Sequence, residues 1–251
     1  MRALITNDDG IDSPGLATLA LAAVECGLDV IVAAPMTQSS GTSASVAAVG
    51  ENNRVLSERR SLPGLDAEAY AVAAHPGLIS LIACRGGFGG KPDLVLSGVN
   101  LGANVGRAIL HSGTVGAALT GHLNDVSSMA VSLDAGLDGP EPLWDKAGEV
   151  VRVVLPLLLE APPASVLSLN VPNIGDVQGL RWAELARFGS VQSRVDEVDD
   201  NEIELVTVYS EETLVPGTDA SLLASGYATL TALHSVGRDT SAERPLPAWP
   251  A

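Results

Sequence analysis

Aromatic side chains, lysines and long apolar runs are all scarce in this chain of 251 residues. Only 3% of the residues are aromatic, although 46% are hydrophobic, so Val, Leu, Ile and Ala must build the core. Aliphatic runs of this kind favour buried parallel strands. No apolar stretch approaches the roughly 20 residues that a membrane-spanning helix needs, and the first residues do not resemble a signal peptide. The sequence therefore predicts a cytoplasmic protein without a membrane partner.

Positive charge is also in short supply. The chain has 14 basic and 30 acidic residues, a formal net charge of −16, and only two of the basic residues are lysines. Such a surface repels the nucleic-acid backbone and anionic membranes. A small anion can still bind where a metal ion or a helix N-terminus reverses the sign locally. The composition thus argues against nucleic-acid polymers as partners and leaves small anions as candidate ligands.

Cysteine is rare as well, and its placement is uninformative for metal chemistry. Cys26 and Cys84 have no CxxC spacing and no accompanying histidine cluster, which argues against a zinc site. We expect two small core residues in a reducing compartment, not a disulfide.

Short aliphatic runs alternate with helical patterns over the first two thirds of the chain, which is typical of a doubly wound parallel sheet. Ser13 and Pro14 have the character of an N-cap and a first helical residue. The expected strands are residues 2–6, 28–34, 93–97, 128–133 and 166–170, and the expected helices are about 14–26, 114–123 and 143–159.

The pattern changes after residue 172. Polar and apolar residues alternate there as in antiparallel strands, in residues 181–188, 202–210 and 227–236. We therefore divide the chain into an α/β core, residues 1–172, and a β-rich C-terminal extension, residues 173–251, that could pair outward or with a second subunit. The acidic run 196–202 predicts a solvated loop, and the proline-rich tail 244–250 predicts irregular structure.

Two adjacent aspartates, Asp8 and Asp9, stand between the first expected strand and the first expected helix. They should therefore lie at the carboxyl edge of the sheet, where open α/β folds bind ligands. Neighbouring carboxylates in a crevice raise each other's pKa unless a cation neutralises them. Oxygen ligands alone favour Mg²⁺ or Mn²⁺ over Zn²⁺. In the alternative interpretation, one aspartate caps the helix and the other is an ordinary turn residue.

Two further segments should reach the same edge. The loop 37–45, TQSSGTSAS, offers hydroxyl groups around a glycine, with a plain polar loop as the alternative. The segment 97–118 supplies Asn100, a neutral oxygen ligand, and the sequence HSGT at a helix N-terminus, where N–H and hydroxyl groups can bind phosphate. Its glycines are spaced by four with no lysine following, which argues against dinucleotide and nucleoside-triphosphate motifs.

The stretches NDDGIDSPGL, SSGTSAS, PDLVLSGVNLGANVG and HSGTVGAA together resemble the SurE family of metal-dependent nucleotidases. The likeness runs from residue 1 to about 135 and continues more weakly in residues 168–172 and 217–233. It implies a Rossmann-like three-layer α/β fold with a mainly parallel sheet, whose C-terminal extension is exchanged between subunits of a homodimer or homotetramer. The implied activity is hydrolysis of phosphomonoesters, chiefly nucleoside monophosphates, with one Mg²⁺ or Mn²⁺ ion per subunit.

The resemblance also implies which residues form the site. Asp8 and Asp9 would be both catalytic residues and metal ligands. For the serine metal ligand the alternatives are Ser39 and Ser40, and the Ser-Gly order of the family favours Ser40. The remaining implied roles are metal binding by Ser40 and Asn100, and phosphate binding by Asn104, Ser112, Gly113 and Thr114. The expected reaction is in-line attack of a metal-activated water on phosphorus.

Several positions depart from the family pattern: residues 73–80, Arg107, His111 and Thr120. They leave the substrate preference open, because they could reshape the pocket without touching the implied metal ligands. His111 could act as a general acid or could be a wall of the pocket. An aspartyl-nucleophile phosphatase is disfavoured because it needs acidic residues two apart. The remaining alternative is a non-catalytic nucleotide- or metal-binding stress protein.

Overall fold

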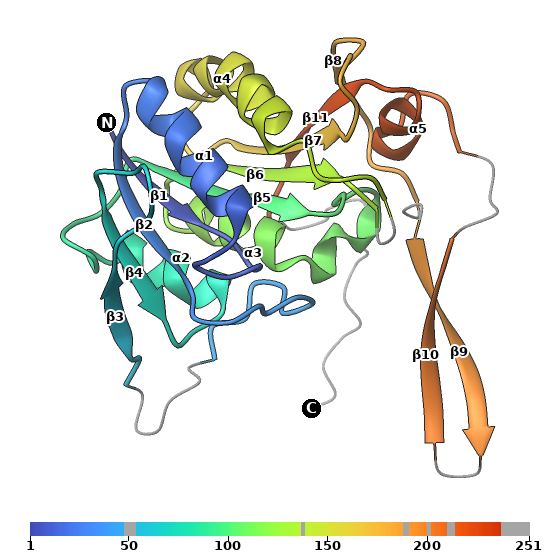
Figure 1. Cartoon of the computed structure of the whole chain (residues 1–251), viewed down its shortest axis with the longest axis horizontal. Coiled ribbons are helices and arrows are strands. Elements are labelled where there is room, and N and C mark those ends of the chain that lie inside the picture. Colours follow the sequence, from blue (N-terminus) through green and yellow to red (C-terminus); the bar gives the residue numbers. More distant parts are fainter. Residues whose placement is uncertain (48–53, 137–138, 188–190, 200–201, 210–213, 237–251) are drawn as a thin grey trace, which may run out of the picture.

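A nine-stranded sheet forms the centre of the protein in the computed structural model (Figure 1). The model describes residues 1–47, 54–136, 139–187, 191–199, 202–209 and 214–236. In spatial order the strands are β3 (Ser57–Arg60), β4 (Glu68–Val72), β2 (Asp29–Pro35), β1 (Arg2–Thr6), β5 (Leu94–Leu101), β6 (Ser127–Asp134), β7 (Val166–Pro172), β11 (Ala228–Leu233) and β8 (Leu180–Trp182).

The six strands from β4 to β7 run parallel to one another, and their aliphatic side chains are buried on both faces. Antiparallel neighbours occur on both sides of this block, because β3 pairs with β4 and β11 with β7 in the opposite direction. The predicted Rossmann-like α/β fold with a mainly parallel sheet is confirmed.

Helices cover both faces and give the fold three layers (Figure 1). Helices α1 (Pro14–Glu25) and α4 (Trp144–Glu160) pack together over one face, and α2 (Pro76–Cys84) and α3 (Gly113–His122) over the other. Helix α1 lies directly on β5: a Cβ atom added to Gly15 would lie 2.0 Å from the Val99 carbonyl oxygen. Only glycine permits this approach, which fixes the helix against the strand that carries Asn100.

The strands and helices expected in the first two thirds of the chain are present. The largest difference in length is at β5, which continues to Leu101 instead of ending at residue 97. Four elements of this part were not expected: β3, β4, α2 and the 3₁₀ helix η2 (Arg107–His111). Strand β3, with the sequence SERR, is exposed along its whole length, so it carries no apolar alternation that could have revealed it.

Beyond residue 172 the chain divides between the main sheet and a separate hairpin. Strands β8 and β11 join the main sheet, and the short helix α5 (Asp219–Ala224) packs on β11. Strands β9 (Val191–Asp199) and β10 (Glu202–Tyr209) pair with each other and extend away from the body (Figure 1). The division of the chain into an α/β core, residues 1–172, and a C-terminal extension, residues 173–251, remains a proposal.

Two expectations for this region are wrong. The described part of the acidic run is not a loop, since residues 196–199 lie in β9 and Glu202 begins β10. The antiparallel ladder of β9 and β10, with a register shift between Glu202 and Ile203, includes acidic residues that composition alone assigns to a turn. The strand expected at residues 181–188 is limited to β8, which ends at Trp182. The tail 244–250 lies outside the described residues.

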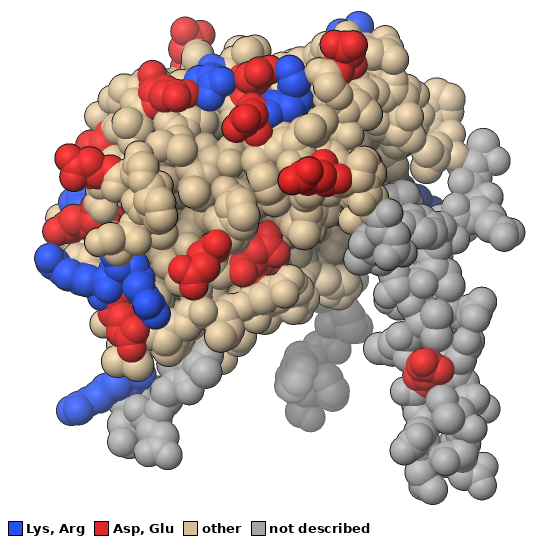
Figure 2. Space-filling model, viewed as in Figure 1, with Lys and Arg blue, Asp and Glu red and all other residues tan. Residues whose placement is uncertain are grey.

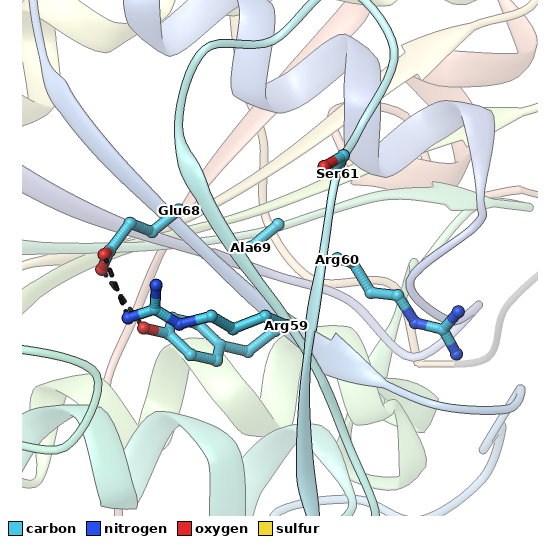
Figure 3. Close-up of a pocket in the computed structure, with 6 residues that line it drawn as sticks. Arg59, Arg60, Ser61, Glu68 and Ala69 are labelled. Atoms are coloured by element: carbon cyan, nitrogen blue, oxygen red, sulfur yellow. Dashed lines mark hydrogen bonds and ion pairs between the residues drawn. The ribbon is translucent and has the colours of Figure 1, made fainter.

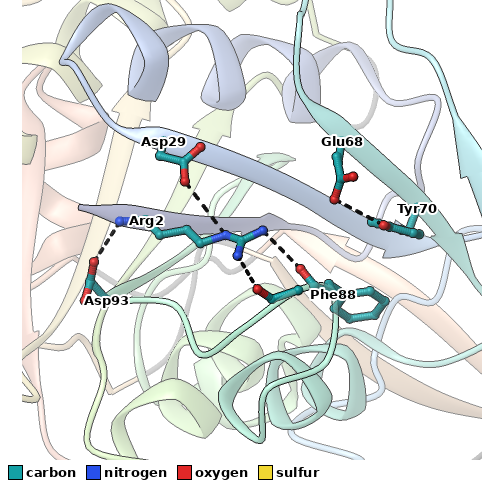
Figure 4. A network of polar contacts seen from close by, with 7 residues as sticks. Arg2, Asp29, Glu68, Tyr70, Phe88 and Asp93 are labelled. Carbon is teal, nitrogen blue, oxygen red and sulfur yellow. Dashed lines mark hydrogen bonds and ion pairs between the residues drawn. The ribbon is translucent and has the colours of Figure 1, made fainter.

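Arg2 connects the amino ends of three strands (Figure 4). Its main-chain N–H donates to Asp93 at 2.7 Å, and its guanidinium donates to the carbonyl oxygens of Gly89 at 2.6 Å and Phe88 at 3.1 Å. The guanidinium also lies 4.0 Å from Asp29 at the start of β2. These contacts stabilise the edge of the sheet opposite to the one that carries Asp8.

The acidic surface and the free cysteines are as expected from the sequence. Acidic side chains are spread over the face shown in Figure 2, with basic side chains beside some of them. Cys26, half-buried, and Cys84, buried, are both free thiols. None of the helices in the described part of the chain combines the length and apolarity needed to cross a bilayer.

Candidate active site at the carboxyl edge of the sheet

A tight turn after β1 places the aspartate pair at the carboxyl edge. The Asn7 amide oxygen accepts from the Gly10 N–H at 3.1 Å, and its Nδ2 donates to the Gly10 carbonyl at 3.0 Å. Gly10 has φ +102°, a value that glycine adopts readily. The turn leaves Asp8 almost fully buried, with 4% exposure, and Asp9 half-buried.

Asp8 faces the first turn of α3. The Thr114 hydroxyl donates a short hydrogen bond to Asp8 Oδ1. A Cβ atom on Gly113 would lie 2.9 Å from Asp8 Oδ2, so only glycine fits beside this carboxylate. Burial raises the pKa of Asp8, the Thr114 hydrogen bond opposes the rise, and the charge of Asp9 adds to it. Keeping Asp8 ionised in the absence of metal therefore costs free energy, and a bound cation would offset that cost.

Asp9 connects the turn to two neighbouring segments. The Leu101 N–H donates to Asp9 Oδ2 at 3.0 Å, and Gln38 Nε2 lies 3.5 Å from Asp9 Oδ1. The same Gln38 nitrogen donates to the Ser40 hydroxyl at 3.2 Å. Burial raises the pKa of Asp9, and the hydrogen bonds from Leu101 and Gln38 oppose it. Asp9 and Ser40 thus lie on either side of one amide donor.

Asn100 is next to Leu101 at the end of β5. Its Nδ2 donates to the Gly102 carbonyl at 2.7 Å, which leaves the amide oxygen as the atom that can bind a cation. The pairing of β5 with β6 shifts register between Ser97 and Asn100, so the strand is irregular where it reaches the site.

The phosphate-binding candidates belong to the loop after β5 and to the start of α3. Asn104 Nδ2 donates to Ser132 at 2.8 Å, and Asn104 exchanges backbone-to-side-chain hydrogen bonds of 2.9 Å with Asn170. The Ser112 hydroxyl caps α3 by accepting from the Val115 N–H at 3.1 Å. Because this cap uses the Val115 N–H and the Thr114 N–H hydrogen-bonds Asp8, the Gly113 N–H is the first-turn group left for an anion among the described residues.

The departures from the family pattern lie outside this contact network. Arg107 and His111, which bound the 3₁₀ helix η2 (Arg107–His111), are both exposed. Thr120 is buried and donates to the Gly116 carbonyl at 2.7 Å, inside its own helix. Residues 73–80 form the start of α2 and the segment before it.

The structure therefore brings Asp8, Asp9, Ser40 and Thr114 into one network with the backbone next to Asn100. Sequence reasoning missed Gln38, Asn170 and Ser132, because nothing in their spacing shows that they contact the site. Asn7 had a signal, since it precedes the aspartate pair directly.

This donor set fits a hard dication. Within the described residues, no group of three or more His, Cys, Asp or Glu side chains is arranged to hold a metal ion. A cation at the sheet edge must therefore use the two carboxylates together with neutral oxygens, which suits Mg²⁺ or Mn²⁺.

The Ser39 and Ser40 hydroxyls offer a direct test of the ligand set. Ser40 is exposed and hydrogen-bonded to Gln38, whereas the Ser39 hydroxyl oxygen is buried without a hydrogen-bond partner in the described structure. We expect Ser40→Ala to weaken Mn²⁺ binding about tenfold in calorimetry, roughly the loss of one weak ligand. Ser39→Ala is the matched variant and should leave the Mn²⁺ affinity unchanged. The reverse pattern would make Ser39 the ligand.

A hollow lined by residues of β3 and β4 is not a competing candidate for the active site (Figure 3). Its arginines are already paired, Arg59 with Glu68 at 3.5 Å and Arg60 with Glu58 at 3.3 Å. Arg59 also lies 5.7 Å from the centroid of the Tyr70 ring. The hollow therefore has neither the carboxylate pair nor a free cation for an anionic substrate.

Comparison with known proteins agrees with this geometry. The family model described as Survival protein SurE matches residues 3–191. The chain is 35% identical to a protein named 5'-nucleotidase SurE of Clostridium botulinum, and 34% identical to one of Rhodopseudomonas palustris; each alignment covers 93% of both chains. The solved structure of the SurE protein from Aquifex aeolicus superposes with a TM-score of 0.75 and 28% identity, covering 93% of both chains. The chain belongs to the SurE family.

Proposed function

We propose that this chain is a metal-dependent 5′-nucleotidase that hydrolyses nucleoside monophosphates or related small phosphomonoesters. The observation that carries the proposal is the buried Asp8 carboxylate, joined to Thr114 at the N-terminus of α3 and next to Asp9. One crevice thereby combines a cation-binding acid pair with a helix terminus that favours phosphate. The names of the curated relatives support the same reaction.

Asp8, Asp9, Ser40 and Asn100 would hold one Mg²⁺ or Mn²⁺ ion per subunit. When bound, the ion supplies Lewis acidity toward phosphate and lowers the pKa of water. The protein supplies position: the turn made by Asn7 fixes the acid pair, and the hydrogen bond from Thr114 fixes Asp8. Asp9 or Asp8 would also orient the attacking water, and Asp9 is the more exposed of the two acids.

Substrate phosphate would bind between the metal ligands and α3. The Gly113 N–H lies in the first turn of α3 and has no intrahelical acceptor, whereas the Thr114 N–H is engaged with Asp8. The Asn104 amide uses one of its two protons for Ser132 and keeps the other for a phosphate oxygen. Donors fixed in this way stabilise the charge that develops on the equatorial oxygens.

The non-catalytic alternative is not favoured. Arg107 and His111 are exposed, and Thr120 is turned into its own helix, so these departures leave the acid pair and its partners in place. Assembly as a homodimer or homotetramer through exchange of the C-terminal extension and a cytoplasmic location complete the proposal.

Removal of metal tests this function directly. We expect purified protein with Mn²⁺ to release phosphate from p-nitrophenyl phosphate and from a panel of nucleoside monophosphates. EDTA should reduce the rate to background, and excess Mn²⁺ or Mg²⁺ should restore it, because both carboxylates then regain their counter-charge. Turnover that survives complete chelation would contradict the metal-dependent mechanism. Tight nucleotide binding without phosphate release would instead support the non-catalytic nucleotide-binding stress protein.

A further inference from the structure

We propose that Asp219, in the C-terminal part of the chain, is a positioning residue for the phosphate-binding loop; this inference rests on the proposed function. Asp219 is 1% exposed and lies 113 residues after Gly106, the loop residue that it contacts. Its carboxylate accepts three backbone N–H groups, from Gly106 at 2.7 Å, Ala186 at 2.9 Å and Ala220 at 2.8 Å. A charge buried this deeply needs such donors, and each is a charge-assisted hydrogen bond.

The two carboxylate oxygens of Asp219 have different partners. Oδ1 accepts from Ala186 and Ala220, which belong to the C-terminal part of the chain itself. Among the described residues, Oδ2 accepts only from Gly106, which ends the loop that carries Asn104. One oxygen therefore organises the surroundings of α5, and the other holds the site loop.

Gly106 is the point from which the site loop is directed into α3. It has φ +66° and is the residue before η2, which ends at His111 and is followed at once by Ser112. The next residue, Arg107, donates its N–H to the Ala186 carbonyl at 3.0 Å. Asp219 and Ala186 thus fix both residues at the bend, while Asn170 and Ser132 fix Asn104 from the other side.

The metal ligands have supports of their own besides this anchor. Asp8 and Asp9 are held by the turn at Gly10, and Asn100 is held by Gly102. The inference is therefore specific: loss of the Gly106 contact should disturb phosphate binding and transition-state stabilisation, but not cation binding.

The variant Asp219→Asn separates the two oxygens. An amide oxygen in the Oδ1 position keeps the contacts to Ala186 and Ala220, and the amide nitrogen then faces the Gly106 N–H, where two donors cannot bond. We expect kcat/KM for p-nitrophenyl phosphate to fall about 100-fold, the effect of a small misplacement of catalytic groups. KM and the inhibition constant of inorganic phosphate should both rise, while the Mn²⁺ affinity from calorimetry stays within twofold of wild type.

Thr218→Ala is the matched control. Thr218 caps α5: its hydroxyl accepts from the Ser221 N–H at 3.4 Å and donates to the Val215 carbonyl at 2.7 Å, and neither partner belongs to the site loop. It should lower the melting temperature while KM and the phosphate inhibition constant remain unchanged. A purely structural role of Asp219 would produce the same result in Asp219→Asn, and that outcome would overturn the proposal.

Hydrogen exchange keeps this test separate from the proposed function. Amides of residues 103–112 should exchange faster in Asp219→Asn than in Thr218→Ala, whether or not the protein is active. If wild-type protein releases no phosphate, the nucleotidase proposal fails, and the exchange result still decides whether Asp219 holds the loop. Equal exchange in the two variants would refute the anchoring.

Discussion

Asp8→Asn is expected to lower kcat/KM by about 1,000-fold or more, equivalent to about 4 kcal/mol of transition-state stabilisation. The Asn side chain can still accept the hydrogen bond from Thr114, so the crevice keeps its geometry. It no longer supplies the negative charge that a dication requires. Steady-state kinetics at saturating Mn²⁺ would measure the loss.

The same variant should fold as well as wild type. Burial raises the pKa of Asp8, so ionising it at neutral pH opposes folding in the metal-free protein. A neutral amide removes that penalty and the repulsion from Asp9. In urea unfolding without metal, we expect the free energy of unfolding of Asp8→Asn to be no more than about 0.5 kcal/mol below that of wild type.

Metal-dependent stabilisation supplies the second measurement. Wild-type protein should gain about 2.7 kcal/mol at a metal concentration 100 times its dissociation constant, and Asp8→Asn should gain far less. Asp12→Asn is the control, because Asp12 is an exposed acid only four residues away. Near-normal activity of Asp8→Asn would remove Asp8 from the ligand set.

Gly113→Ala is expected to reduce kcat/KM about 100-fold, because a small displacement of catalytic groups has effects of this size. The added methyl group would lie 2.9 Å from both Cβ and Oδ2 of Asp8, closer than van der Waals contact allows. Either Asp8 or the first turn of α3 must move, and each carries part of the site. Overpacking should also reduce the free energy of unfolding by about 1–3 kcal/mol.

The control for this substitution is Gly175→Ala. A methyl group on Gly175 meets nothing within 4 Å, so the same chemical change should leave both activity and stability unaltered. Kinetics and urea unfolding of the two variants would be compared side by side. If Gly113→Ala retained full turnover, the close packing of α3 against Asp8 would have no catalytic role.

The sequence was sufficient to place the acid pair. Asp8 and Asp9 follow a buried aliphatic strand, and the rule for carboxyl ends of parallel strands places them beside the end of β5 and the loop after β2. The observed contacts of Asp9 with Leu101 and Gln38 agree with that prediction. The roles of Ser40, Asn100 and Asn104 remain predictions that the variants above address.

Other parts of the site could not be predicted because they depend on tertiary packing. The hydrogen bond from Thr114 to Asp8 joins residues 106 positions apart, and its geometry depends on how closely Gly113 approaches the β1 turn. The contact between Asp219 and Gly106 joins residues 113 apart. Local spacing contains no information on either distance. The family-like motif around Asp219 was visible, but its physical role was not.

The composition of β3 has a consequence for how the protein behaves at high concentration. This strand forms one border of the nine-stranded sheet, and its four residues, including Glu58, Arg59 and Arg60, are all exposed. Short, charged border strands resist pairing with the border of another molecule. A chain so rich in Val, Leu and Ala is thereby protected from growing into extended β-aggregates at this border.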